Sequence, residues 1–378
     1  MINSSPYDGF THSNPWLMEI NNDDAIIGPE DIPLTASYIW SKSGQDREDL
    51  VSWVFNYYRE NGFVSSDMSD SDLLSDFVKL KKKNPDDIIN TYGEINNSSS
   101  LCNNVFKHFV WDKYFSAKGE AKSRSVIDVF HNDQIFLDVL KNRMGYCLSC
   151  EDGTERPYVF TITDKMILQG IRSTGYGYSV SLFKPLVGKY LYKNYAKKRV
   201  FDYSAGWGAR CLAAMSLGLE YYGVDPLTAS EINGMIGFFG GTGHVIDGCS
   251  EDNIYQNIPQ VDCIMSSPPY FNLEVYSDDE RQSISRFKKY EDWISAYWNG
   301  TVTNCLNILQ DDGYFIMVAK DSVKKHNISS DMRMVCEKNG LVLEKEMCYK
   351  TSTNHLSDKK KTNRISKNDE IVSIFCKK

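Results

Sequence analysis

KRVFDYSAGWGARCLAAMSLG, residues 198–218, is the stretch of sequence that decides the fold. It begins with the apolar run of a short buried strand, continues through a loop with two glycines, and ends in a helix-favouring run of alanine, leucine and methionine. A strand followed directly by a glycine loop and a helix is a building unit of an open α/β sheet.

The segments that follow repeat this alternation. Strands are expected within 219–226, 241–252, 261–270 and 313–321, and helices within 291–309 and 329–340. Two further strands, 341–350 and 370–378, have no helix between them and are expected to pair as an antiparallel hairpin. The pattern predicts a mostly parallel sheet with helices on both faces.

The first half of the chain has a different pattern. Apolar residues at helical spacing predict helices over 47–63, 69–83 and 125–144, whereas residues 1 to about 35 are polar and irregular. We therefore divide the chain into a mainly helical region, 1–150, a connecting segment, 151–182, and an α/β domain, 183–378.

Charge is distributed unevenly along the 378 residues. The formal net charge of −8 by itself argues against a nucleic-acid-binding protein. Residues 1–150 carry 22 acidic and 14 basic side chains, whereas residues 151–378 carry 28 of each. The deficit is concentrated in residues 1–78, with 14 acidic and 3 basic side chains, so a nucleic-acid-binding face is expected only outside them.

Cysteine use and hydropathy predict a cytoplasmic protein. The ten cysteines are scattered and several lie in apolar runs, which is typical of reduced thiols inside cells. Cys147 and Cys150 form one C-x-x-C pair, but no second pair or histidine follows at zinc-site spacing, so no metal is expected. The sequence has no run of about 18 apolar residues and no signal peptide at its start, so no contact with a membrane is expected.

Two loops at the carboxyl ends of predicted strands have unusual residues, and ligands bind there in open α/β sheets. In the first loop, Gly206 and Gly208 let the backbone approach a ligand at the amino end of a helix. Their G-x-G spacing lacks the third glycine of the dinucleotide fingerprint, so a nucleotide-dependent oxidoreductase is disfavoured. In the second, the carboxylate of Asp225 can accept hydrogen bonds from two ribose hydroxyls, or can serve only as a turn acid before Pro226.

A third such loop, SSPPY at 266–270, ends an apolar strand abruptly. Pro268 and Pro269 cannot donate ladder hydrogen bonds, and Pro268 biases Ser267 away from helical conformations. The result is a stiff turn that holds a hydroxyl group and an aromatic ring in fixed positions. Such turns also occur as ordinary loops, and it is the convergence of three loops at one sheet edge that favours a functional site.

The order of FDYSAGWGAR, YYGVDP and SSPPYF resembles that of the S-adenosylmethionine-dependent amino-methyltransferases of DNA. The resemblance covers residues 183–376 and implies a class I, Rossmann-like methyltransferase domain with a mostly parallel seven-stranded sheet. It implies S-adenosylmethionine as cofactor and double-stranded DNA as partner, with methyl transfer to the exocyclic amine of a flipped-out base. A leading serine in the S-P-P-Y motif resembles the N4-cytosine enzymes more than the N6-adenine enzymes, and both targets stay open.

The resemblance also assigns roles to particular residues. Ser267, Pro268, Pro269 and Tyr270 form the catalytic turn. Cys249 stands where the family often has an acid near the adenine ring. The residues expected to contact the cofactor are Phe183, Pro185, Asp202, Ser204, Ala205, Gly206, Gly208, Asp225, Pro226, Asp247, Cys249 and Ser266.

The turn suits the chemistry of an exocyclic amine. The lone pair of such an amine is delocalised into the base ring, so the nitrogen is a poor nucleophile. Acceptors that hold its N–H groups restore tetrahedral character; Ser267 Oγ and the Pro268 carbonyl are the expected acceptors, with Tyr270 stacked on the base. A stiff turn keeps them fixed as charge develops. The chain has no Pro-Cys dipeptide, the nucleophile of carbon-5 cytosine methylation, so that reaction is set aside.

Basic residues near the same sheet edge are candidates for phosphate contacts. The polar segment 272–290 is expected to form a lid, and the tip between the last two strands is the clearest basic cluster. The residues concerned are Arg281, Arg286, Lys288 and Lys289 in the lid, and Lys359, Lys360, Lys361 and Arg364 in the tip. The alternative for each is a solvated surface. Only about 60 residues separate the glycine loop from SSPPY, so target recognition is expected in the front region, within 79–180.

Three other functions stay open. An RNA amino-methyltransferase can use the same cofactor fold and a Pro-Pro-aromatic turn, although the front region has no recognisable RNA-binding module. A protein that binds without catalysis is disfavoured because the glycine loop, Asp225 and the S-P-P-Y turn are all intact. A separate nuclease partner is compatible with a chain that has no evident nuclease motif.

Overall fold

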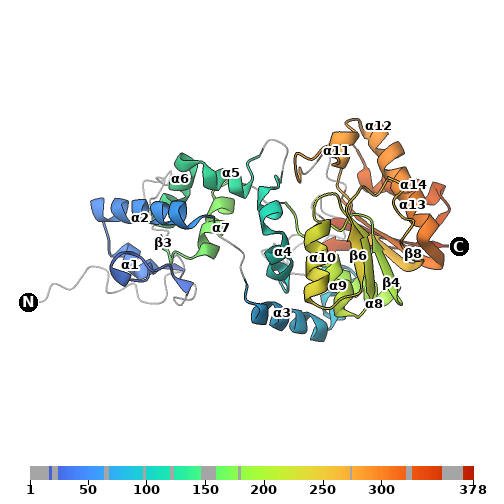
Figure 1. Cartoon of the computed structure of the whole chain (residues 1–378), viewed down its shortest axis with the longest axis horizontal. Coiled ribbons are helices and arrows are strands. Elements are labelled where there is room, and N and C mark those ends of the chain that lie inside the picture. Colours follow the sequence, from blue (N-terminus) through green and yellow to red (C-terminus); the bar gives the residue numbers. More distant parts are fainter. Residues whose placement is uncertain are drawn as a thin grey trace, which may run out of the picture. The chain divides into compact units, whose positions relative to one another are not determined.

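The computed structural model describes residues 17–18, 24–63, 68–96, 99–119, 123–145, 159–177, 180–272, 275–320, 326–350 and 369–378. The chain forms two compact units, each built from two separate segments (Figure 1). Met1–Ser65 and Lys122–Ser179 form the first unit, and Ser66–Ala121 and Val180–Lys378 form the second. This division differs from the contiguous ranges expected from the sequence, because residues 66–121 fold with the α/β domain.

The first unit is mainly helical. Its elements are β1 (Leu17–Met18), the 3-10 helix η2 (Pro29–Asp31), α1 (Ala36–Trp40), α2 (Gln45–Asn61), α5 (Val126–His131), α6 (Asp133–Arg143), β3 (Val159–Phe160) and α7 (Asp164–Ser173). The single helix predicted over 125–144 is wrong, because Asn132 has extended backbone there. Its side chain accepts a hydrogen bond from the Ile135 N–H group and so begins α6 anew.

The second unit is built on an eight-stranded sheet in the order β2-β9-β10-β8-β7-β4-β5-β6. The strands are β2 (Ile95–Asn96), β4 (Arg199–Asp202), β5 (Glu220–Val224), β6 (Gly243–Ile246), β7 (Val261–Ser266), β8 (Leu309–Ala319), β9 (Leu341–Lys350) and β10 (Glu370–Lys377). The helices are α3 (Asp70–Lys82), η3 (Pro85–Ile88), α4 (Asn103–Ser116), α8 (Pro185–Tyr195), α9 (Ala209–Ser216), α10 (Ala229–Phe238), α11 (Ser283–Arg286), α12 (Tyr290–Asp292), the π-helical segment η4 (Trp293–Trp298), α13 (Asn299–Ile308) and α14 (Ile328–Lys338).

The pairing of the strands confirms the predicted fold class. β10 runs antiparallel to both β8 and β9, and the other neighbouring strands are parallel. Apart from the two-residue strand β2, these are the seven strands predicted from the sequence, in a mostly parallel, Rossmann-like sheet. The eighth strand, β2, comes from the front region and extends the sheet beside β9.

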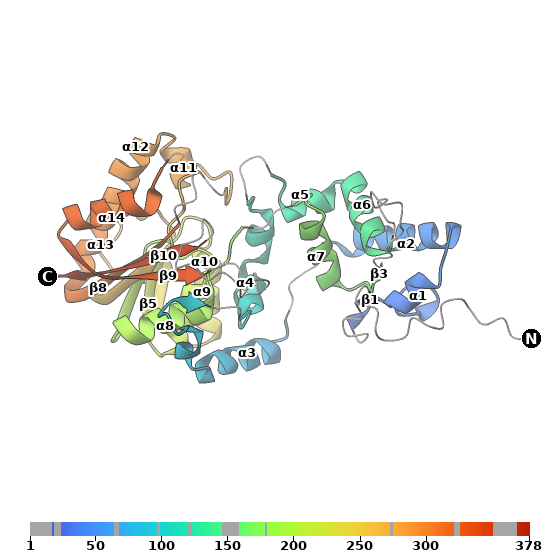
Figure 2. The ribbon, with the colours of Figure 1, turned by 180° about the vertical axis from the view of Figure 1, so that it is seen from behind.

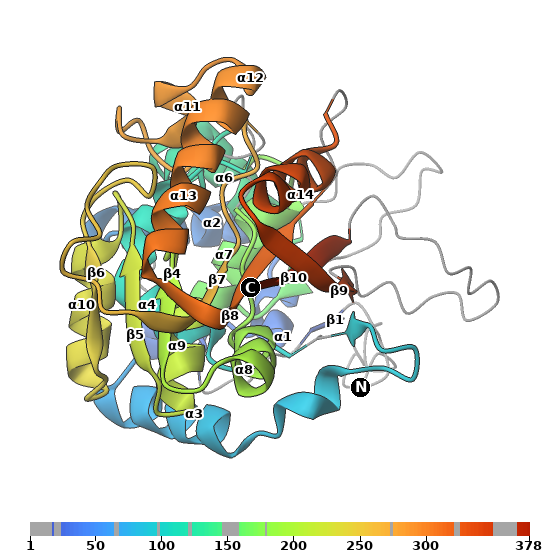
Figure 3. The same cartoon turned by 90° about the vertical axis from the view of Figure 1, so that its right-hand side faces the viewer.

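Two apolar layers cover the sheet, one on each face (Figure 3). One face packs against α8, α9 and α10, and the core on this side includes Leu73, Phe77 and Phe106 of α3 and α4. The other face packs against η4, α13 and α14, where Trp293 and Trp298 are fully buried. Both faces of a parallel sheet must be covered, and α3 and α4 complete the first layer.

A buried lysine joins α3 to the rest of the second unit. Lys189 of α8 donates hydrogen bonds to the carbonyl oxygens of Leu80, Lys81 and Lys83, at 2.7, 2.9 and 2.8 Å. These carbonyls belong to the last turn of α3 and its C-cap residue, where a helix leaves carbonyl groups without helical partners, so the ammonium group caps that helix. Figure 2 shows α3 close to α8 and α9. The segment 66–121 is therefore held to the α/β domain by polar as well as apolar contacts.

The sheet brings the carboxyl ends of β4, β5 and β7 to one edge. Asp202 ends β4, Asp225 follows β5 and Ser266 ends β7, so the three unusual loops lie together, as their positions in the sequence predict. None of the helices that the structure describes is long and apolar enough to span a membrane.

Candidate active site

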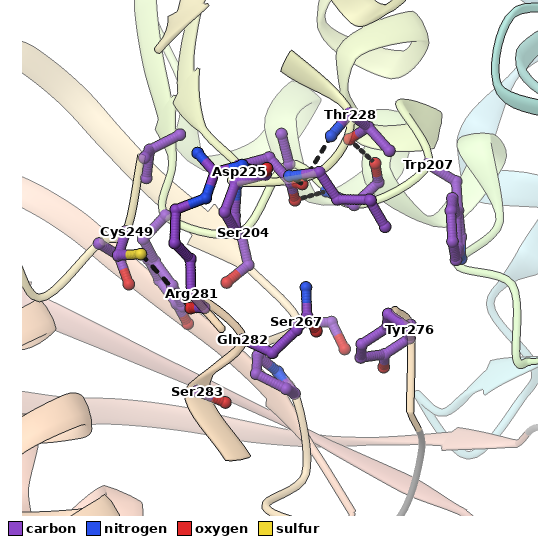
Figure 4. A pocket seen from close by; sticks show the side chains of 18 of the residues that line it. Ser204, Trp207, Asp225, Thr228, Cys249, Ser267, Tyr276, Arg281, Gln282 and Ser283 are labelled. Atoms are coloured by element: carbon purple, nitrogen blue, oxygen red, sulfur yellow. Dashed lines mark hydrogen bonds between the residues drawn. The ribbon is translucent and has the colours of Figure 1, made fainter. Parts of the chain in front are cut away.

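A cleft of about 960 Å³, open to solvent, lies at this edge of the second unit (Figure 4). Ten of the residues singled out in the sequence line it: Phe183, Ser204, Ala205, Gly206, Asp225, Pro226, Cys249, Ser267, Pro269 and Arg281. The other described residues of that set, Pro185, Asp202, Gly208, Asp247, Ser266, Pro268, Tyr270, Arg286, Lys288 and Lys289, are not on its wall.

The glycine loop has the backbone that its sequence demands. Gly206 and Gly208 have φ angles of 59° and 88°, in the left-handed region that other residues rarely adopt. A Cβ atom at Gly208 would lie 2.8 Å from Met235 Cε, so a side chain there would also require the end of the Met235 side chain to move. Gly208 directly precedes the first residue of α9, so the glycine loop places the amino end of that helix beside the cleft.

Asp225 holds the glycine loop to the loop that follows β5. Its Oδ2 accepts a hydrogen bond from Gly206 N at 2.8 Å, and its Oδ1 accepts from Leu227 N and Thr228 N at 2.9 and 3.0 Å. Burial raises the pKa of this carboxyl, and the three N–H donors oppose that rise. Since each carboxylate oxygen has two acceptor sites, Oδ2 keeps one for a ligand while Oδ1 is filled.

Asp202 has a different role from the cofactor contact expected of it. It is fully buried, and its carboxylate accepts hydrogen bonds from Arg210 Nε at 2.7 Å and from the Tyr221 hydroxyl at 2.8 Å. Arg210, on α9, lines the cleft and also donates to Ser204 O and Ser266 Oγ. Asp202 therefore lies behind the cleft wall and holds the guanidinium group of Arg210 at that wall.

The S-P-P-Y turn places its hydroxyl and its ring in different surroundings. Ser267 is half-buried and faces the cleft, and its Oγ lies 2.9 Å from the Tyr270 hydroxyl. The Tyr270 hydroxyl donates to Glu370 Oε1 at 3.0 Å, and the tyrosine is only 6 % exposed within the core. Phe271, which follows, has a φ of 54°, a strained value of the kind that clusters at functional turns.

Two other aromatic residues stand on the cleft wall. Trp207, in the glycine loop, and Tyr276, in the segment after the turn, have ring centroids 6.0 Å apart at 67°. Trp207 also meets Tyr114 of α4 edge to face, with centroids 5.4 Å apart. Helix α4 therefore fixes one wall of the opening, and a flat aromatic ligand would meet Trp207 or Tyr276 before the buried ring of Tyr270.

The cleft wall beyond β6 carries polar groups that are largely withdrawn from water. Burial raises the pKa of Cys249, whose thiol donates to Arg281 O, and that of Glu251, whose Oε1 lies 2.6 Å from Arg286 Nη1. The buried hydroxyl of Tyr297, on η4, has no hydrogen-bond partner in the part of the chain that the structure describes. Burial raises the pKa of this hydroxyl, and the nearby side chains of Ser204 and Ser250 oppose that rise.

Four residues of the segment predicted to be a lid line the cleft, and its two arginines are paired within the chain. Arg281 donates to Asp247 Oδ1 and Pro226 O, both at 2.6 Å, and to Asp279 Oδ2 at 2.8 Å. Arg286 binds Asp252 as well as Glu251. Arg281 lines the cleft and Arg286 lies off its wall, and both side chains spend hydrogen-bond donors on carboxylates of the chain itself.

The remaining basic residues and the cysteine pair lie either off the cleft wall or outside the described residues. Lys288 and Lys289 are exposed. Lys359, Lys360, Lys361 and Arg364, together with Cys147 and Cys150, lie outside the described residues. Within the described ranges no group of three or more histidine, cysteine, aspartate or glutamate side chains is arranged to hold a metal ion.

Sequence reasoning missed several residues of this site. Glu251, Gln282 and Tyr297 line the cleft, and Glu370 supports the S-P-P-Y turn from outside it. Glu251 belongs to the DGCSED loop. It lies two residues after Cys249, the position at which the resemblance implies an acid. The sequence also indicates a role for Arg210, because a charged residue in the apolar first turn of α9 needs a buried partner. No such signal pointed to Tyr297 or Glu370, since the loops that they approach are distant in sequence.

Comparison with known proteins gives a limited result. No family model and no curated protein matches the chain at a significant level. Among solved structures, TrmN from Thermus thermophilus is similar, at 12 % identity over 51 % of this chain and 49 % of that one, with a TM-score of 0.34. A methyltransferase from Pyrococcus furiosus matches at 12 % identity over 51 % and 82 % of the two chains, with a TM-score of 0.35.

A third similar structure is a TehB-like SAM-dependent methyltransferase from Corynebacterium glutamicum, at 16 % identity over 56 % of this chain and 94 % of that one, with a TM-score of 0.34. The match with TrmN spans about half of that protein. Similarities of this size add nothing to what the sheet order and the cleft show by themselves.

Proposed function

We propose that the protein transfers a methyl group from S-adenosylmethionine to the exocyclic amine of a base in double-stranded DNA. The observation that carries the proposal is that Ser267 and Pro269 stand on the wall of the same cleft as the glycine loop and Asp225. One cleft therefore offers a surface for the cofactor next to acceptors for an amine.

The methionine end of the cofactor fits the side of the cleft that holds Arg210. Its guanidinium is paired with Asp202 through Nε and Nη2, while Nη1 has no hydrogen-bond partner among the described residues. A carboxylate of the ligand would pair with this remaining N–H donor, and the amino end of α9 attracts negative charge to the same place. This residue extends the set inferred from the sequence.

The ribose fits beside Asp225. Its Oδ2 retains one acceptor site, so we expect one ribose hydroxyl to donate there, in place of the two that the sequence suggested. The adenine ring fits beyond it, where the Tyr297 hydroxyl and the buried thiol of Cys249 lie on the cleft wall and supply polar contacts. The residues present therefore suit all three parts of the cofactor.

The turn supplies the chemistry at the amine. When bound, S-adenosylmethionine supplies an electrophilic methyl group. Ser267 Oγ and the Pro268 carbonyl accept hydrogen bonds from the N–H groups of the base amine. This makes the nitrogen more nearly tetrahedral and its lone pair more available for methyl transfer. Because Tyr270 is buried, the flipped base is expected to stack on Trp207 or Tyr276 at the opening. The leading serine of the motif favours the N4 amine of cytosine over the N6 amine of adenine.

The test is incubation with labelled S-adenosylmethionine and unmodified duplex DNA, followed by nucleoside analysis, with structured RNA in parallel. We expect label in N4-methylcytosine or N6-methyladenine from DNA, and none with the Ser267→Ala variant. Calorimetry should show that this variant still binds the cofactor. Label in RNA alone would make the protein an RNA amino-methyltransferase, and no transfer to either polymer would reject the proposal.

A further inference from the structure

A chain of three polar groups runs from the cleft wall into the sheet. Ser267 Oγ and the Tyr270 hydroxyl lie 2.9 Å apart, and the Tyr270 hydroxyl lies 3.0 Å from Glu370 Oε1. Ser267 faces the cleft, Tyr270 is buried and Glu370 is half-buried. The chain thus connects the place expected for the substrate amine to a carboxylate on the far side of the turn.

The direction of the hydrogen bonds follows from the number of protons. An ionised carboxylate can only accept, so the single hydroxyl proton of Tyr270 is donated to Glu370. The phenol oxygen can then only accept from Ser267, and the Ser267 proton points away from the cleft. The lone pairs of Ser267 Oγ consequently face the cleft, which is the state that an acceptor for N–H groups requires. Without the carboxylate, the serine hydroxyl could equally donate toward the cleft.

The topology explains how a residue 100 positions away reaches the turn. Parallel strands present only their carboxyl ends at this edge, whereas β10 is antiparallel and presents its first residue. Ile371 is paired with Ala319, the last residue of β8, so Glu370 stands at the level where the parallel strands end. An acid at the start of the last strand is therefore placed next to the turn by the sheet itself.

We infer that Glu370 orients Ser267 through Tyr270 and receives the proton that the substrate amine releases. The inference rests on the proposed function. The nitrogen lone pair forms the new N–C bond and the C–S electron pair stays on the sulfur of the cofactor. The surplus N–H proton passes to Ser267 Oγ, the serine proton passes to the Tyr270 oxygen, and the tyrosine proton passes to the carboxylate. Glu370 ends protonated and, being half-buried, returns the proton to solvent.

Single-turnover methylation by the full-length protein tests the relay. Glu370→Gln keeps an oxygen that accepts from Tyr270 but cannot take up a proton, and we expect the rate to fall roughly 10- to 100-fold with unchanged cofactor affinity. In the unsubstituted protein the rate should fall as Glu370 is protonated at acidic pH, and this limb of the pH profile should vanish in the variant. The matched control is Glu346→Gln on the neighbouring strand β9, which removes an ion pair with Arg333 of α14 and should leave the rate unchanged.

A double-substitution cycle separates a relay from a structural effect. Tyr270→Phe breaks the chain at its middle, so adding Glu370→Gln to it should cost no further rate. If the two losses multiply, or if Glu370→Gln alone stays within twofold of the unsubstituted rate, the inference is overturned.

A measurement without nucleic acid keeps the relay distinct from the proposed function. The Cζ resonance of Tyr270, identified by its disappearance in Tyr270→Phe, should titrate with the carboxylate and lose that titration in Glu370→Gln. If this holds and no polymer is methylated, the hydrogen-bond chain stands as described and the proposed reaction fails. If the resonance ignores Glu370, the relay is wrong whatever the protein methylates.

Discussion

At the scale of single residues, the site depends on two aspartates with opposite surroundings. Asp225 accepts three backbone N–H groups and holds two loops together, whereas Asp202 is fully buried and neutralises Arg210. A buried charge is costly unless it is paired, so the pair keeps a cationic group at the cleft wall. The sequence predicted a cofactor contact for both aspartates, whereas the structure places Asp225 on the cleft wall and Asp202 in an ion pair behind it.

Replacing Asp202 by asparagine should destabilise the protein strongly. The substitution leaves the buried guanidinium of Arg210 without a counter-charge, and breaking such a pair costs about 3–5 kcal/mol. Asp87→Asn, which removes an exposed pair with Lys83, should leave the stability almost unchanged. Urea unfolding of both variants measures the difference, and equal losses would show that Arg210 is not held by Asp202.

Glu251 should make stability depend on pH. Burial raises the pKa of its carboxyl, so the folded state holds this proton more tightly than the unfolded state. Its contribution is therefore full below the ordinary glutamate pKa of about 4.3 and is lost as pH rises toward the raised value. Glu251→Gln should flatten the dependence of the urea midpoint on pH in that window, and an unchanged slope would contradict the assignment.

At the scale of elements, the periodicity of the sequence predicted the helices and strands well and their partners poorly. The alternation after residue 198 predicted the sheet, because each strand and helix there is adjacent to its neighbour in the chain. The apolar stripe of α3 predicted a helix but not the surface against which it packs, because the same stripe can be covered by either unit. Glu370 was unpredictable for the same reason: only the antiparallel pairing of β10 places it at the turn.

Helix α4 should support cofactor binding from a distance. Lys113 donates to Leu227 O at 2.6 Å and pairs with Glu231 at 2.5 Å, which fixes the loop that carries Asp225. Lys113→Met keeps the apolar stem but removes both contacts, and we expect S-adenosylmethionine to bind roughly 3- to 10-fold more weakly, a loss of about 1 kcal/mol. Calorimetry measures it, with Lys79→Met as the control at an exposed pair on α3. Equal affinities of the two variants would dismiss this supporting role.

At the scale of the whole molecule, each unit is built from two separate segments, so contiguous domain boundaries do not describe the chain. The segment 66–121 supplies β2 to the sheet edge and buried residues of α3 and α4 to one core layer, while the segment 122–179 that follows belongs to the other unit. Composition could not reveal this, because both segments have the residues of ordinary amphipathic helices. The chain leaves the α/β unit and returns to it, so its unit boundaries are set by packing.

A chain that begins at residue 183 should therefore fail to fold. It would expose the surface of α8, α9 and α10 that Leu73, Phe77 and Phe106 cover, and would leave Lys189 without the carbonyls that it caps. A second chain, in which residues 66–121 are joined to 180–378 by a flexible linker, keeps these contacts and the whole cleft. We expect it to unfold cooperatively and to bind S-adenosylmethionine within about threefold of the full chain, a difference of roughly 0.6 kcal/mol. Circular dichroism and calorimetry on both chains decide the matter, and a stable, cofactor-binding fragment 183–378 would show that the first two helices of the unit are dispensable.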